Sequence, residues 1–363
     1  MRVTPNIYRQ LGAAPAARLG AVSAAASNTS TELTYRLKYA YADFNKVFAN
    51  IAPLKDDKLT IGQQPNVLVD WEENLYGFRW VNLTPWNYLS LSSAQTGISF
   101  HGPVRFGDKQ YLDYAIALYD NSTFHTLEES ESKQTMGRLS FYPFGAVSTF
   151  QGLGLTGAFD YGYTDVTPDT AAHWPIFRLA ALAHYSSKRN GYGIAGEYDR
   201  GRNSFTSGNL FSGSGPADEF GLGPTPYANL DALAQALLNY NGTEQQGFAF
   251  FGHADIPRSK LTLFGMDEYF QPNIRVSRNP LDFNRLIAGI AYKYNDHVRF
   301  SVDTQNLFYR QSQFTFPAGE LAQFDPKLAA QNPSGIANAV PKGINAVLFN
   351  VEIRFNQELL HNQ

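Results

Sequence analysis

The sequence predicts an all-β fold, a transmembrane antiparallel β-barrel of which about 14 strands are visible. Three observations predict it. Apolar and polar residues alternate with a period of two along many segments of the chain. The links between these segments alternate between short and long. Aromatic residues make up 14% of the chain, charged residues only 17%, and cysteine is absent, a composition that suits strands meeting a lipid interface.

The bulk numbers exclude several classes of protein. A net charge of −3 gives no electrostatic case for a nucleic-acid partner. Without cysteine, the chain can form neither disulfides nor thiolate metal sites, and we expect no cofactor. No apolar run reaches the ~20 residues of a membrane-spanning helix, whereas a transmembrane strand needs only ~9–11. The 363 residues are therefore expected to form a single barrel domain, 1–363.

The strands are expected where two faces can be separated. In segment 32–44, leucine and tyrosine share one face while Arg36 and Lys38 share the other, and only a strand turns a period of two into two faces. Segment 345–355 alternates in the same way. Segments 247–256 and 258–270 alternate poorly. The remaining predicted strands are 1–10, 57–64, 95–103, 111–119, 133–143, 152–163, 177–185, 191–200, 282–294 and 297–303.

The connections sort by length. Asn190-Gly191 and Asn295-Asp296 are strong hairpin signals. Short turns on the periplasmic side and long loops on the extracellular side are typical of outer-membrane barrels; link 45–56 is longer than the other periplasmic links. The short links are 105–109, 187–191, 256–259 and 294–297, and the long ones are 65–94, 120–132, 165–176, 201–245, 271–281 and 310–344.

A soluble β-sandwich or propeller is the alternative fold, because sandwich strands also alternate. Its loops would not sort by length between two ends, and its outward faces would be polar. Here one face is apolar and rich in tyrosine, while the other carries arginine beside glycine and alanine. That contrast favours an apolar belt outside and a wet lumen inside.

The order of several motifs resembles a known family. The motifs are RVTPNIYRQ (2–10), LTYRLKYAYADF (33–44), LTIGQQP (59–65), WEENLYGFRW (71–80) and SAQTGISFHGPV (93–104). This order resembles the phosphate-selective porin O/P-like family of bacterial outer-membrane porins. The resemblance implies a 16-stranded, usually trimeric channel in the Gram-negative outer membrane, with one loop folded into the lumen.

The same resemblance bears on the N-terminus. Residues 1–30 contain no signal peptide, since the alanine-rich stretch 12–26 is broken by Pro15 and Arg18. The family normally has two strands before the one that resembles RVTPNIY. We therefore expect the signal peptide and first hairpin to lie upstream of Met1, which also accounts for fourteen visible strands where the family has sixteen.

Strand parity assigns charged residues to the lumen, where rings of charge set ion selectivity. Acidic residues on the same faces are Asp113, Asp160, Glu197, Asp303 and Glu352, so the lining is mixed in sign. The alternative is that these charges only hydrate and cross-brace the wall. The predicted pore-lining basic residues are Arg36, Lys38, Arg138, Arg178, Arg285, Lys293, Arg299 and Arg354.

Loop 65–94 is the candidate constriction. It carries three of the four tryptophans of the chain, Trp71, Trp80 and Trp86. As a constriction, it would fold inward and set its acids against the arginines of the wall. Alternatively, the tryptophans form an interface girdle and the acids face solvent. The candidate constriction residues are Asp70, Glu72, Glu73 and Arg79.

These features predict a porin for passive diffusion of small hydrophilic solutes or ions, with anions as one option. The expected surroundings are outer-membrane lipid, lipopolysaccharide and two further copies in a homotrimer. A barrel that sheathes a partner protein is the alternative. No motif of a known enzyme class occurs, and no enzyme is expected. A barrel hydrolase using a lipid-facing histidine, among His101, His253 and His297, stays formally open.

Overall fold

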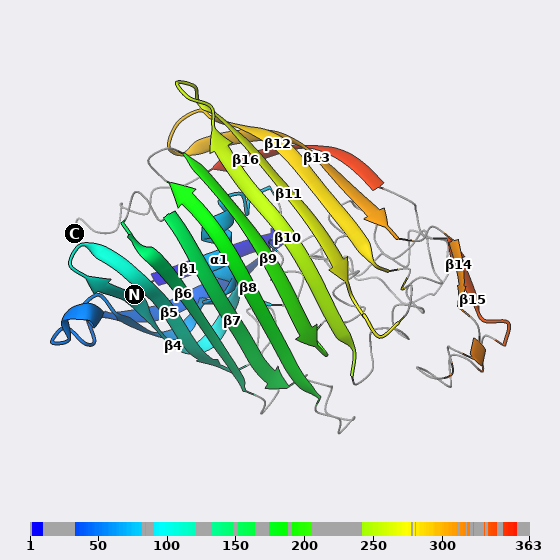
Figure 1. Cartoon of the computed structure of the whole chain (residues 1–363), viewed down its shortest axis with the longest axis horizontal. Coiled ribbons are helices and arrows are strands. Elements are labelled where there is room, and N and C mark those ends of the chain that lie inside the picture. The colour runs from blue at the N-terminus through cyan, green and yellow to red at the C-terminus, as the bar shows by residue number, and fades with distance from the viewer. Residues whose placement is uncertain are drawn as a thin grey trace.

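A computed structural model gives the fold. It describes residues 2–9, 33–81, 84, 91–120, 133–147, 152–163, 174–187, 191–204, 242–276, 279, 281–310, 313–316, 318–319, 322, 330, 333–339 and 344–353. Fourteen strands form one antiparallel sheet in the order β1 to β13 followed by β16. The sheet curves around an interior, called the lumen below (Figure 1). Pairing between the end strands, β1 and β16, is not seen among the described residues.

The strands coincide with the predicted segments, and the antiparallel sheet of about fourteen strands is confirmed. Their bounds are β1 Arg2–Arg9, β2 Leu33–Asn45, β3 Lys58–Pro65, β4 Ala94–Phe106, β5 Lys109–Tyr119, β6 Gln134–Ala146, β7 Gly152–Tyr163, β8 Pro175–Ser187, β9 Tyr192–Arg202, β10 Glu244–Asp255, β11 Leu261–Gln271, β12 Phe283–Lys293, β13 Val298–Tyr309 and β16 Ile344–Ile353.

Four elements lie in the links. Helix α1 (Val69–Tyr76) follows β3, the short 3-10 helix η2 (Ala52–Leu54) lies between β2 and β3, and β14 (Gln313–Phe316) pairs with β15 (Ile336–Ala339). None of the four was predicted from the sequence. No helix in the described part of the chain is long and apolar enough to cross a membrane.

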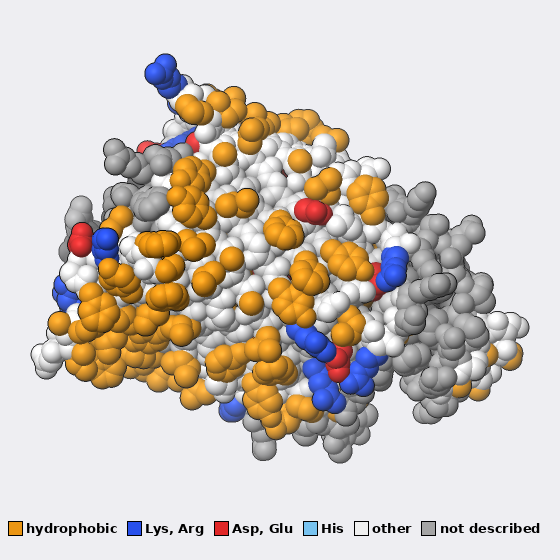
Figure 2. Space-filling model, viewed as in Figure 1, with side chains coloured by type: hydrophobic (Ala, Val, Ile, Leu, Met, Phe, Trp, Pro, Cys, Tyr) orange, Lys and Arg blue, Asp and Glu red, His pale blue; other side chains and the backbone are white. Residues whose placement is uncertain are grey.

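The two faces of the sheet are reversed relative to a soluble protein. Large apolar side chains point outward and are exposed, and Figure 2 shows them spread over the outer surface. They include Ile116, Leu139, Leu155, Phe177, Ile194, Phe250, Leu263, Leu286, Phe300 and Phe349. Polar and charged side chains point inward and are buried. They include Ser140, Asp160, Arg178, Glu197, Gln245, Glu268, Arg285 and Asp303.

This reversal has an energetic consequence. Moving one large apolar side chain from water into an apolar medium is worth about 1.5–3 kcal/mol. An outer surface carrying many such side chains is therefore unfavourable in water and favourable in a lipid bilayer. Because every strand between the two ends of the sheet is hydrogen-bonded on both sides, their backbone groups are also satisfied in lipid.

The connections sort by length as predicted. The turns after β4, β8, β10 and β12 are short and share one end of the sheet, whereas β3–β4 and β9–β10 are joined by long links at the other end. In the turn after β8, Gly191 has a φ of 64°, a left-handed conformation that glycine adopts without strain. We call the two ends the short-turn end and the long-loop end (Figure 1).

Strand β2 corrects one face assignment. Tyr41 and Asp43 line a cavity of the lumen, and Asp43 accepts a 2.7 Å hydrogen bond from Thr60. The pairing of β1 with β2 shifts register at Lys38, so alternation does not carry across this residue, and its pore-lining position stays a prediction. The alternation predicts Tyr41 on the apolar, outward face, and its position at the cavity corrects this, because a tyrosine can also place its polar hydroxyl in a polar interior.

Candidate functional site in the lumen

The inward segment is built around α1, which begins and ends at recognisable signals. The Asn66 side chain accepts hydrogen bonds from the backbone N–H groups of Leu68 (2.9 Å) and Val69 (3.2 Å). At the other end, Gly77 adopts a φ of 77° and donates its N–H to the carbonyl of Glu73, as a left-handed helix cap does. The link therefore enters the lumen as a defined helical turn.

An apolar cluster holds this segment against the wall formed by β9 to β12. Phe78 stacks on Phe264 with ring centroids 4.3 Å apart, and Tyr76 meets Phe251 edge to face at 5.5 Å. All four rings are almost completely buried. The cluster is completed by Ala195, Met266, Ile287 and Ala291. Burial of these rings in a water-filled lumen stabilises the inward position of the segment.

Carboxyl groups lie beside the cluster. Glu72 of α1 is completely buried, and its carboxyl lies at the Glu197 carboxyl on β9, which also contacts Asp199. On the same wall, Arg285 and Glu268 form a buried ion pair at 2.7 Å.

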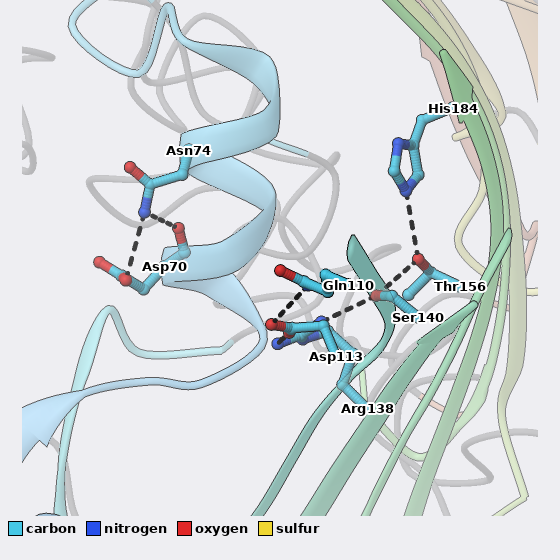
Figure 3. A network of polar contacts seen from close by, with 8 residues as sticks. All are labelled: Asp70, Asn74, Gln110, Asp113, Arg138, Ser140, Thr156 and His184. Carbon is cyan, nitrogen blue, oxygen red and sulfur yellow. Dashed lines mark hydrogen bonds and ion pairs between the residues drawn. The ribbon is translucent and has the colours of Figure 1, made fainter. Parts of the chain in front are cut away.

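A polar network covers the wall from β5 to β8, next to the helix that carries Asp70 and Asn74 (Figure 3). Arg138 is paired with Asp113 and donates to the Ser140 hydroxyl at 2.8 Å. Through Thr156 the network extends to His184. The Arg138 guanidinium also lies 4.8 Å from the centre of the Trp71 ring, so the helix and the wall are in direct contact here.

Two cavities flank the helix. One, of about 320 Å³, lies between α1 and β2 to β6 and is lined by charged groups of both signs, among them Asp43, Lys58, Asp70, Asp113 and Arg138. The other, of about 420 Å³, opens toward the short turns and is lined by His253, Asp255, Lys293 and Arg299. Trp71 and Asn74 line both cavities, so α1 stands between them.

The predicted basic residues occupy different surroundings. Arg138, Arg178 and Arg285 are buried in the lumen wall, and Arg178 is paired with Asp160. Lys293 and Arg299 line the larger cavity. Lys293 lies 2.7 Å from Asp296, and this hydrogen bond lowers the pKa of the Asp296 carboxyl. The side chain of Arg36 and all of Arg354 lie outside the described residues.

The four loop residues separate into three environments. Asp70 lines the smaller cavity together with Arg138, and in Figure 3 its carboxylate lies beside Asn74, on the side of the helix away from the Arg138 network. Glu73 and Arg79 form an ion pair with each other at 2.5 Å. Glu72 does not face the open lumen, because it is buried against β9. Glu72 nevertheless lies close enough to Arg285 of the wall for the two charges to interact.

Several residues that line the lumen were not predicted from the sequence. Lys58 and His101 line the smaller cavity, and Asn74 lines both cavities. Lys58 could have been predicted to face the lumen, because it lies an even number of residues from Thr60 and Gln64, which point inward on β3. His101 and His253 face the lumen and His297 lies in a turn, so none of the three has the lipid-facing wall position that a barrel hydrolase would need.

Comparison with known proteins gives distant likenesses. No family model matches the sequence, and no curated protein matches it. Among solved structures, the chain is similar to the outer-membrane protein OmpT of Vibrio cholerae, with 10% identity over 88% of this chain and 81% of that one and a TM-score of 0.48.

Two further structures show the same degree of likeness. The anion-selective porin from Comamonas acidovorans has 9% identity over 81% of this chain and 74% of that one, with a TM-score of 0.46. The outer membrane channel DcaP of Acinetobacter baumannii has 9% identity over 96% and 97%, with a TM-score of 0.43. The assignment of the fold comes from the sheet itself.

Proposed function

We propose that the chain is a porin of the Gram-negative outer membrane, through which small hydrophilic solutes or ions diffuse passively. One observation carries the proposal: the sheet presents exposed apolar side chains outward and charged side chains inward, around cavities that flank an inward helix. A liposome-swelling assay tests it. Vesicles containing the protein should swell in isotonic solutions of small sugars, progressively more slowly as the sugar becomes larger.

The ion preference of the channel is a separate proposal. The resemblance to the phosphate-selective porin O/P-like family favours anions. The smaller cavity, however, carries Lys58 and Arg138 together with Asp43, Asp70 and Asp113, and a strong phosphate channel would need a continuous row of arginine and lysine. We therefore propose a weakly selective channel, and we extend the proposal to a homotrimer in contact with lipopolysaccharide.

A barrel that sheathes a partner protein is less well supported. In this chain α1 and its apolar cluster occupy the space along β9 to β12 that an inserted partner would need. A channel for small solutes requires only the cavities beside the helix.

Replacing Arg138 by glutamine is expected to shift the ion selectivity toward cations. The change removes one positive charge from the lining of the smaller cavity and leaves Asp113 without its ion pair. The reversal potential under a salt gradient measures the shift. Arg258→Gln, in the exposed turn between β10 and β11, removes the same charge outside the cavities and should leave the reversal potential unchanged. Equal potentials for both variants would refute the assignment of Arg138 to the solute path.

A further inference from the structure

A cluster of arginines lies on the outward surface at the long-loop end. Arg200 and Arg202 are at the end of β9, and Arg275 follows β11. Glu244, at the start of β10, accepts hydrogen bonds from Arg200 at 3.0 Å and from Arg275 at 2.5 Å. The side chains of Arg200 and Arg275 are 51% and 48% exposed, so the cluster is held in place yet open to its surroundings.

The cluster borders the apolar outer surface. Arg200 is the cross-strand neighbour of Leu179, and Arg202 is that of Phe177; both apolar side chains are exposed. One step further along β9, Tyr198 packs on Phe248 with ring centroids 4.8 Å apart. Figure 2 shows blue arginine and lysine side chains gathered around a red one at the margin of the orange surface. Cationic and apolar groups therefore meet within one patch.

The chemistry of the cluster suits phosphate groups. Among the described residues of the patch, three arginines stand against the carboxylate of Glu244, which gives this part of the surface an excess of positive charge. A guanidinium has five N–H donors, of which Arg200 uses one and Arg275 two in bonds to Glu244. The remaining donors form the planar arrangement that binds phosphate oxygens in pairs.

We propose that Arg200, Arg202 and Arg275 bind the phosphate groups of an anionic lipid of the outer leaflet, whose acyl chains lie along Phe177 and Leu179. This inference rests on the proposed function, because it places the long-loop end at the outer membrane surface. The arginine stems lie along the apolar surface while the guanidinium groups reach the headgroup level. A free phosphate ion on its way through the channel would not meet this patch, since the patch faces away from the lumen.

The test uses the full chain and diphosphoryl lipid A as the probe. Native mass spectrometry of the detergent-solubilised protein counts bound lipid A, and titration gives its affinity. The triple variant Arg200→Gln/Arg202→Gln/Arg275→Gln is expected to bind lipid A at least about tenfold more weakly, because paired charge-assisted contacts are lost. The control Arg258→Gln/Lys260→Gln removes exposed charges at the short-turn end and should bind lipid A like the wild type.

The possible outcomes are distinct. Equal lipid A affinity in the wild type and the triple variant would overturn the proposal. Displacement of lipid A by millimolar inorganic phosphate would assign the site to the free ion and overturn the lipid assignment, as would dissociation of an oligomer in the triple variant with lipid A binding unchanged. The variant Arg200→Lys/Arg275→Lys keeps the positive charges and replaces the triple variant in the test if that variant fails to fold. Its affinity for lipid A should lie between those expected for the wild type and the triple variant. Channel activity in neutral lipid is measured separately, so failure of the porin function is distinguishable from failure of the lipid site.

Discussion

Replacing both Tyr76 and Phe78 by alanine is expected to raise the single-channel conductance at least about twofold. These two rings hold the inward segment on the wall, through Phe251 and Phe264. Truncation of a buried aromatic side chain typically costs about 3–5 kcal/mol. The loss of both rings therefore removes more stabilisation than a short segment in the lumen can lose without detaching from the wall. Once the segment is released, α1 no longer narrows the path, and ions cross a wider opening.

The matched control removes the same kinds of ring from the outer surface. Tyr292 and Phe300 are cross-strand neighbours that point outward and are exposed. The variant Tyr292→Ala/Phe300→Ala should keep the wild-type conductance, because it does not touch the lumen. If the Tyr76→Ala/Phe78→Ala variant also conducts like the wild type while folding normally, the inward segment does not limit the flow of ions.

The second large effect is expected at the buried ion pair between Arg285 and Glu268. Both side chains are almost fully buried and lie 2.7 Å apart. Replacing Arg285 by methionine removes the ion-pair partner of the buried Glu268 carboxylate, and breaking a buried pair on one side costs about 3–5 kcal/mol. The free energy of unfolding, measured by urea titration in lipid vesicles, should fall by an amount in this range.

Two further variants show whether the loss of stability comes from the broken ion pair or from altered packing. The double variant Arg285→Met/Glu268→Leu removes both charges and should recover most of the lost stability, because replacing a whole buried pair by apolar residues is often neutral. Lys293→Met breaks the exposed pair with Asp296 and should leave the free energy of unfolding almost unchanged. Equal losses in the single and double variants would show that packing, and not the unpaired charge, controls stability at this position.

The strands could be predicted from the sequence, because a strand with one apolar and one polar face shows this alternation within its own residues. The outward apolar residues of β7, β8, β12 and β13 follow the alternation read from the sequence. The weakly alternating segment 258–270 also forms a strand, because it pairs with a neighbour on each side. Its outward position 267 is an aspartate that accepts a hydrogen bond from Asn284, and this polar pair blurs the alternation.

The lumen site was less predictable, because its geometry depends on contacts between distant segments. The Asn66 side-chain bonds that precede α1 and the Gly77 cap that ends it are local and could have been recognised. The burial of Glu72 beside Glu197 depends on how the helix docks, and the 125 positions that separate them in the numbering carry no pattern that pairs them. The inward position of Tyr41 was not predictable, because tyrosine suits both lipid and a polar interior.

Single-channel recording in planar lipid bilayers tests the central claim most directly. Purified protein should insert in discrete steps of constant conductance, and the current should rise in proportion to salt concentration, as expected for a water-filled lumen lined by charges of both signs. Well-folded protein that inserts into the bilayer and carries no current would contradict the claim that solutes pass beside α1.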